Sequence, residues 1–282
     1  MENSDLSLSL NVNTASVKAF AGVAGLIKIF QFMLAVALIK GFKTPEKPYL
    51  STNYYFFLIV LYLADTPNIL FDSIATIFDL STLQHAGAYY LFYFTFLKVF
   101  LVLIMAIEKV TVLMKENIVR FKPNLCIVLT IFAGMVAALF AVLDLFVLTQ
   151  FNLYSVSGLI YMIATVVLLF GVYKYYRCTK DGKFVEIKVE MRIFWSLFIS
   201  VIIQVAGAIY NIFVIITIAK GMEKDSEGTG SGTNYWDTIV TQVTMIFAVE
   251  ALSNISLMVV LLFVSKGTRK NYLKIWHCAA FK

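Results

Sequence analysis

The sequence has few charged residues. Asp, Glu, Lys and Arg make up 14% of its 282 residues, whereas 60% are hydrophobic and the mean hydropathy is +0.84. A soluble domain carries about 25% charged residues. The apolar residues also fall in runs of about 20 or more, which is the length that crosses a bilayer as a helix. Strands of a membrane barrel would be shorter and alternating. The composition therefore predicts an all-α integral membrane protein.

Histidine is almost absent, and this excludes several classes of membrane enzyme. The two histidines, His85 and His277, both fall outside the apolar runs. Membrane desaturases, haem-binding bundles and zinc-dependent intramembrane hydrolases need histidine ligands within the membrane. The sequence also has no H-E-x-x-H, Walker A or G-x-S-x-G motif. We expect no enzyme, no metal site and no cofactor.

Cysteine is scarce as well. The three cysteines, Cys126, Cys178 and Cys278, fall on or near the side expected to be cytoplasmic, where a structural disulfide is not expected. Cys278 lies in a basic tail, residues 265–282, whose first part can form a short amphipathic helix at the lipid surface. This makes Cys278 a candidate for palmitoylation. A merely solvated basic stop signal is the alternative.

The apolar runs predict seven transmembrane helices over residues 17–264. The runs cover residues 17–39, 53–78, 86–107, 123–149, 156–173, 193–219 and 239–264. Residues 1–16 form a polar tail without Lys or Arg, so they lack the basic start of a signal peptide. The segment 222–233 has the Gly, Ser and acidic composition of a disordered loop.

The basic residues predict that the N-terminus is outside. Eighteen Lys and Arg residues fall in the first, second and third inner loops and the tail of this topology, against three in or beside its outer segments. Such a bias marks the cytoplasmic side. The net charge of +6 follows from these loops, so it does not indicate binding to nucleic acid.

Charged residues near the middle of the spans are the best candidates for a binding site. Four of them fall near one plane and Gln204 falls at similar depth; the four are Lys28, Asp65, Lys98 and Glu250. Each isolated charge would cost about 2.5 to 3.5 kcal/mol at this depth, so such groups usually face the bundle interior and pair. They form either the floor of a ligand or ion pocket, or an ion network that only fixes helix packing.

Three segments, Leu63-Ala64-Asp65, Glu108-Lys109 and residues 263–273, together resemble the G-protein-coupled receptor superfamily. Leu63-Ala64-Asp65 is similar to the segment of helix 2 whose aspartate binds sodium in rhodopsin-like receptors. Glu108-Lys109 occupies the place of the acidic-Arg-Tyr motif at the inner end of helix 3, and residues 263–273 are similar to the junction after helix 7. The chain departs from the family in having Lys109 and Val110 where Arg and Tyr are expected, and in having no proline in helices 5, 6 and 7. Nematode serpentine receptors and bitter taste receptors depart in similar ways.

The resemblance implies a chemosensory receptor in the plasma membrane. A small-molecule ligand would bind among the outer halves of helices 2, 3, 6 and 7, and Glu108 and Lys109 would face a cytoplasmic cavity where a heterotrimeric G protein docks. A transporter or channel is the alternative, because mid-membrane charges also mark transport pathways. A multi-span accessory protein without a ligand is a third reading.

The charge count makes a direct prediction about topology. A tag at residue 2 should be stained by antibody on intact cells, and a tag after Lys282 only after permeabilisation, because the basic loops hold their side of the chain in the cytoplasm. Staining in the opposite pattern would overturn the topology.

Overall fold

The computed structural model describes residues 15–42, 52–113, 123–146, 150–179, 188–226, 233–264 and 269–275, and among these it is helical with no strand. The long helices are α1 (Ala15–Phe42), α2 (Thr52–Asp65), α4 (Ser81–Leu113), α5 (Pro123–Phe146), α6 (Gln150–Thr179), α7 (Lys188–Ser226) and α8 (Thr233–Val264). After α2 come a π-helix, η1 (Ile69–Ile74), and the short α3 (Ala75–Ile77). Residues 269–275 form a further short helix.

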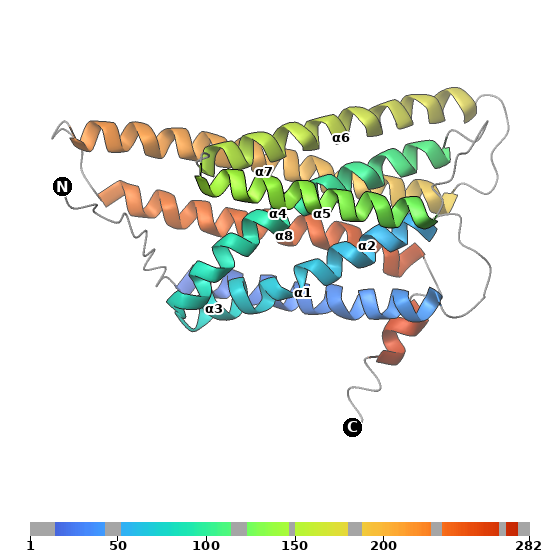
Figure 1. The fold of residues 1–282 in the computed structure, drawn as a ribbon, viewed down its shortest axis with the longest axis horizontal. Coiled ribbons are helices and arrows are strands. Elements are labelled where there is room, and N and C mark those ends of the chain that lie inside the picture. Colours follow the sequence, from blue (N-terminus) through green and yellow to red (C-terminus); the bar gives the residue numbers. More distant parts are fainter. Residues whose placement is uncertain are drawn as a thin grey trace.

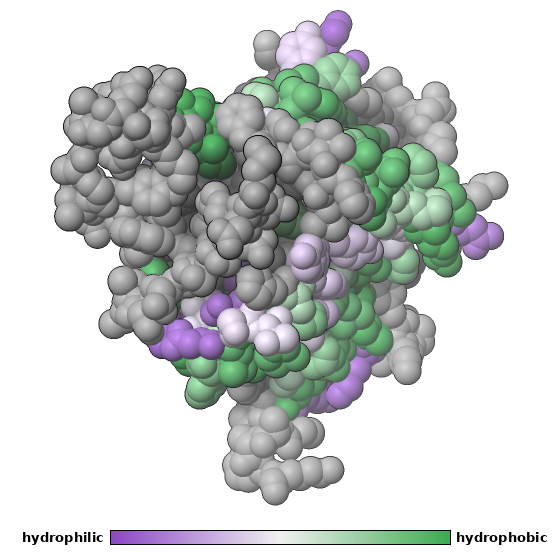
Figure 2. Space-filling view, turned by 60° about the vertical axis from the view of Figure 1, so that its left-hand side comes forward, coloured by the Kyte–Doolittle hydropathy of each residue, from purple (hydrophilic) through white to green (hydrophobic). Residues whose placement is uncertain are grey.

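Six helical spans are long and apolar enough to cross a membrane, so the chain is a multi-pass membrane protein. They are Val17–Lys40, Asn53–Ile77, Ser81–Thr111, Asn124–Leu143, Ser155–Arg177 and Met191–Thr217. In α8 the described apolar stretch is shorter, Ala248–Val259. Most of the coloured surface in Figure 2 is apolar. Large apolar side chains such as Phe132, Met135 and Leu139 of α5 are exposed, as expected for a surface that meets lipid.

The helices pack side by side along one direction (Figure 1). α1 contacts α2 and α8, α2 contacts α4, α4 contacts α5 and α6, α6 contacts α7, and α7 contacts α8. The contacts therefore return to α1, while α5 lies outside this circuit against α4. A core of buried aromatic and aliphatic side chains from α1, α2, α4, α6 and α7 fills the interior.

The second span is interrupted after Asp65, where Pro67 lacks the N–H that would continue the helix. At this break, polar side chains donate hydrogen bonds to backbone carbonyls. The Thr66 hydroxyl donates to the carbonyl of Tyr62 at 3.1 Å, and the Tyr90 hydroxyl of α4 donates to the carbonyl of Ala64. Such repair is required because no water reaches backbone groups within the hydrocarbon.

Two glycines accommodate the π-helix that follows. A Cβ at Gly87 of α4 would lie 2.8 Å from the carbonyl oxygen of Phe71, and one at Gly25 of α1 would lie 2.9 Å from the Cβ of Ser73. Both distances are too short for any side chain. η1 is therefore held between α1 and α4 at positions where only glycine fits.

Several helices are longer than the apolar runs from which they were expected. The run expected over 156–173 belongs to a helix of 30 residues, α6, and α4 and α7 have 33 and 39 residues. α7 continues to Ser226, so the segment 222–233 is helical over its first residues rather than a loop throughout. Residues 1–14 and 276–282 lie outside the described part, and the candidate Cys278 lies there too.

The glycine contacts predict a difference between two Gly→Ala changes. Gly87→Ala should lower stability by about 1 to 3 kcal/mol, because its methyl group meets the backbone of η1. Gly22→Ala on α1 is the matched control, since its Cβ would lie 3.9 Å from its nearest neighbour, Ile77. Thermal unfolding of the two purified variants in detergent measures the difference; equal midpoints would contradict the close packing.

Candidate functional site

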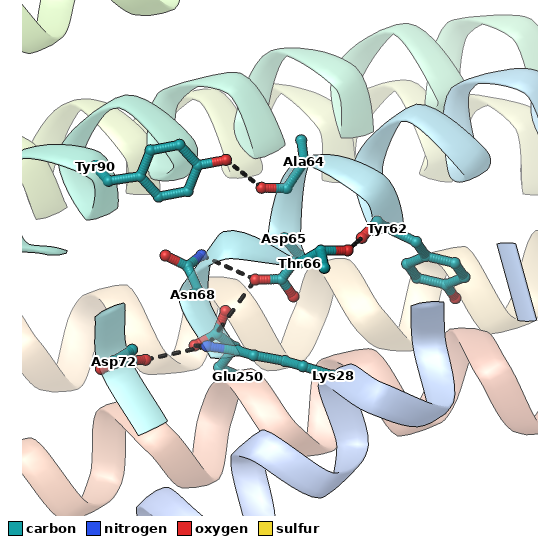
Figure 3. Close-up of polar contacts among 9 residues, drawn as sticks. All are labelled: Lys28, Tyr62, Ala64, Asp65, Thr66, Asn68, Asp72, Tyr90 and Glu250. Carbon is teal, nitrogen blue, oxygen red and sulfur yellow. Dashed lines mark hydrogen bonds and ion pairs between the residues drawn. The ribbon is translucent and has the colours of Figure 1, made fainter. Parts of the chain in front are cut away.

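A buried ammonium group, Lys28 Nζ of α1, is the centre of the polar interior (Figure 3). It lies 3.0 Å from Asp72 Oδ2 of η1, 3.9 Å from Asp65 Oδ1 of α2 and 3.8 Å from Glu250 Oε2 of α8. Its side chain is 1% exposed. We call these four residues the Lys28 cluster. Lys28 is thus held by carboxylates from three separate elements, which are brought together only in the folded chain.

The broken second span places two of these carboxylates. Asp65 is the last residue of α2, and Asp72 follows in η1. Between them, Asn68 Nδ2 donates to Asp65 Oδ1 at 2.9 Å, which fixes that carboxylate next to Lys28. The sequence pattern missed Asp72 because its depth put it nearer the outer face. The spacing of seven residues, two helical turns, was the signal that could have paired it with Asp65.

Lys98 of α4 is the second cation of the interior. It is buried and interacts electrostatically with Asp65 and Glu250. Within the described residues, no hydrogen bond and no ion pair of 4 Å or less is found for its ammonium group. Two lysines therefore face three carboxylates, and with all five ionised the group carries one net negative charge.

A pocket adjoins the Lys28 cluster between α4, α6, α7 and α8. Its volume is about 80 Å³. Leu91, Phe94, Ile246 and Val249 give it apolar walls. Its polar side chains are Thr95, Lys98, Ser157, Tyr161, Gln204, Asn211 and Glu250. Glu250 therefore belongs both to the pocket and to the Lys28 cluster.

The structure divides the five predicted pocket residues into two linked sets. Lys28, Asp65 and Glu250 are brought together in the Lys28 cluster, while Lys98, Gln204 and Glu250 line the pocket. Residues of α6 also line the pocket, and this helix was not among those expected to bind the ligand. Tyr161 and Asn211 were missed because an uncharged polar residue in an apolar run carries no strong signal.

Two polar atoms at the pocket are buried and have no hydrogen-bond partner among the described residues. They are Nε2 of Gln204 and Oδ1 of Asn211. The Asn211 amide nitrogen donates to the Gly207 carbonyl at 3.0 Å, so its oxygen must point elsewhere. Buried polar groups are nearly always paired, so such atoms at a cavity indicate that a water or ligand completes them.

Comparison with known proteins assigns no family. No protein-family model matches the chain, and no curated protein matches it significantly.

Lys109 and Glu108 lie in a different environment from the one expected. The pair was expected at a water-facing cavity, but both side chains are buried, at 1% exposure for Lys109 and 3% for Glu108. Lys109 Nζ lies 4.0 Å from Glu108 Oε2 and 4.6 Å from the ring centre of Tyr54 on α2. Hydropathy gives the depth of a residue along the helix but not which neighbour covers it, so this burial was not foreseen.

The described residues hold no group of three His, Cys, Asp or Glu side chains that could bind a metal ion. In the Lys28 cluster, the space between the three carboxylates is filled by the ammonium of Lys28. The resemblance to the sodium-binding aspartate of helix 2 therefore does not extend to the surroundings of Asp65. The protein supplies its own cation there.

The buried and exposed ion pairs of α1 predict very different costs. Lys28→Met should destabilise the protein by about 3 to 5 kcal/mol, because it leaves buried carboxylates without their cation. Lys18→Met removes the half-exposed pair of Lys18 with Asp79 and should cost less than about 1 kcal/mol. Unfolding in a denaturing detergent series measures both.

A double change tests whether the cluster acts as a unit. Lys28→Met combined with Asp72→Leu should cost less than the two single changes added together, because the second change removes a carboxylate that the first left unpaired. Strictly additive losses would mean that each group acts alone.

Proposed function

We propose that the chain is a seven-helix chemosensory-type receptor of the plasma membrane that passes a small-molecule signal to a heterotrimeric G protein. Its N-terminus is outside, and α8 is the seventh span. The basic bias of the inner loops supports this orientation. The return of the helix contacts from α8 to α1 supports seven spans in one bundle.

The double position of Glu250 is the observation that carries the proposal. Its side chain lines the pocket, and its carboxylate lies 3.8 Å from Lys28. A ligand that pairs with Glu250 competes with Lys28 for the same carboxylate. Binding in the pocket therefore changes the balance of charges on α1 and η1, which have no residue in the pocket lining.

The elements around Lys28 suit a two-state response. η1 is a π-helix next to a proline break, and such irregular turns occur frequently at functional sites. A shift of Lys28 toward Asp65 and Asp72 when Glu250 is engaged would favour one packing of the second span over another. A ligand shifts such an equilibrium only by its difference in affinity for the two states.

The Glu108–Lys109 pair is the proposed element at the cytoplasmic end. In the proposed topology it lies at the inner end of α4, buried against Tyr54 of α2. The cation–π contact joins α2 to α4 there. Its release when the bundle rearranges would open the inner face to a signalling partner.

A transporter is the second candidate, and the break in the second span favours it. Transporters commonly bind their substrate near the bilayer midplane at interrupted helices. Asp65, Asn68 and Asp72 lie at such an interruption, beside a buried lysine. The two functions differ in whether the solute crosses the membrane.

Glu250→Gln separates a signalling role from a packing role. It keeps the shape of the side chain but removes the charge, so ligand potency should fall by at least about tenfold while surface expression is retained. The measurement is G-protein activation in cells that express the chain and are exposed to a library of small amines, carboxylates and amino acids. Asp79→Asn, which removes a carboxylate outside the pocket and the Lys28 cluster, is the control and should respond as the parent does.

The same library distinguishes the two candidates. Activation without uptake supports the receptor. Uptake of a labelled solute into vesicles, blocked by Glu250→Gln and without G-protein activation by the parent, would overturn it in favour of the transporter.

A further inference from the structure

The polar groups that line the pocket fall into two complementary kinds. Lys98 Nζ and Gln204 Nε2 can only donate hydrogen bonds. The Glu250 carboxylate and Asn211 Oδ1 can only accept them, and the Asn211 amide nitrogen donates to the Gly207 carbonyl. A guest that satisfies the pocket must offer both an acceptor group and a donor group.

Two of these groups have no hydrogen-bond partner in the described part of the chain, and the third, Lys98, has only longer-range interactions with Asp65 and Glu250. Lys98 has no ion pair of 4 Å or less, and Gln204 Nε2 and Asn211 Oδ1 have no hydrogen bond. Lys98 is 6% exposed and Asn211 is 4% exposed, so bulk water does not solvate them freely. The terminal torsion of the Gln204 amide is soft and lets its donor turn toward the cavity.

The charge count separates the classes of guest. Lys28, Lys98, Asp65, Asp72 and Glu250 sum to one net negative charge when ionised. A simple carboxylate would raise this to two, in a site that excludes most water. A simple amine would neutralise it but leave the donors of Lys98 and Gln204 unpaired. A zwitterion satisfies donors and acceptors alike and leaves the net charge unchanged.

The pocket volume sets the size of the guest. A single water molecule needs roughly 10 to 15 Å³ by this measure, so about 80 Å³ admits on the order of six water-sized groups. An α-amino acid with a one-carbon side chain has that number of non-hydrogen atoms. The apolar walls formed by Phe94 and Val249 suit a methyl group or a short side chain.

We infer that the pocket binds a small zwitterion of α-amino-acid size. Its carboxylate pairs with Lys98 and Gln204, and its ammonium pairs with Glu250 and Asn211. This assignment names the ligand class of the proposed receptor. Its biological meaning rests on that proposed function, whereas the binding itself does not. The ammonium of the guest then takes the carboxylate that Lys28 shares, which links the ligand class to the Lys28 cluster.

The test compares a zwitterion with its two halves. Propionate is L-alanine without its ammonium group, and ethylamine is L-alanine without its carboxylate. Binding of tritiated L-alanine, and competition by the other two, is measured on the full chain in nanodiscs. L-alanine should bind at least about tenfold more tightly than either half, since each half leaves one pair of polar groups unmatched.

Two outcomes of this comparison would overturn the inference. One is that propionate or ethylamine competes as well as L-alanine itself. The other is that none of glycine, L-alanine and L-serine binds at concentrations up to about 10 mM, beyond the weak end of specific binding. Water would then be the occupant of the pocket.

Two variants assign the ends of the ligand. Lys98→Gln should weaken L-alanine binding by at least about tenfold without weakening ethylamine binding, because only the carboxylate contacts Lys98 and the change removes a cation from the site. Lys174→Gln is the matched control, since Lys174 lies near the Phe170 ring outside the pocket. If Lys98→Gln fails to fold, Gln204→Glu replaces it, and repulsion of the carboxylate should abolish L-alanine binding. Unchanged L-alanine binding in the folded variant would overturn the assignment.

Binding and signalling are read separately, so the two proposals can fail separately. L-alanine binding in nanodiscs without G-protein activation in cells would keep the zwitterion site and overturn the receptor. G-protein activation by an amine or carboxylate library member, with no binding of the three amino acids, would keep the receptor and overturn the zwitterion site.

Discussion

The ammonium group of Lys28 imposes the strongest constraint on this molecule. A lysine in the middle of an apolar bundle is tolerated only when anions surround it, because the membrane offers it no water. The anions come from α2, η1 and α8, all far from Lys28 in the sequence. Each must approach α1 at one depth, so the ion cluster fixes the relative positions of the first, second and last long helices. Apolar packing alone would permit other registers, since lipid competes with every apolar contact.

The same second span must also satisfy its own backbone. Pro67 removes one N–H, and the irregular turns that follow leave carbonyls that a regular helix would have used. The Thr66 hydroxyl donates a hydrogen bond to the carbonyl of Tyr62, and the Tyr90 hydroxyl of α4 donates one to the carbonyl of Ala64. Tyr90 therefore ties α4 to the break, while Gly25 and Gly87 let α1 and α4 approach η1 closely. The hydrogen bond from Tyr90 of α4 and the ion pairs with Lys28 of α1 thus hold the same segment, the end of α2 and η1. A shift of this segment that breaks one of these contacts also strains the other.

Much of the fold follows from hydropathy, but the site follows only in part. Runs of about 20 apolar residues locate spans because each helix satisfies its own hydrogen bonds, whatever its neighbours are. Residues 53–78 were expected to form one unbroken span, so neither the break at Pro67 nor the π-helix after it was predicted; the π-helix depends on glycines contributed by α1 and α4. Lys28, Asp65 and Glu250 could be paired from depth alone, because an unpaired charge there is so unfavourable. Asp72, the burial of Lys109 and the unpaired amides of Gln204 and Asn211 depend on rotation and packing, which depth does not report.

The arrangement of the two polar sites bears on the choice between receptor and transporter. A transported solute must leave the pocket on the side opposite its entry, through a path that can open. On the side of α1 and η1, Glu250 and Lys28 stand between the pocket and Asp72, and the Lys28 side chain is 1% exposed. Opening that side would expose a lysine and two carboxylates at once and separate three helices. A receptor needs only a small shift of the shared carboxylate between two bound partners, a ligand and Lys28. The ion cluster thus closes the pocket on one side as it connects it to the second span, and this combination supports the signalling role that we propose.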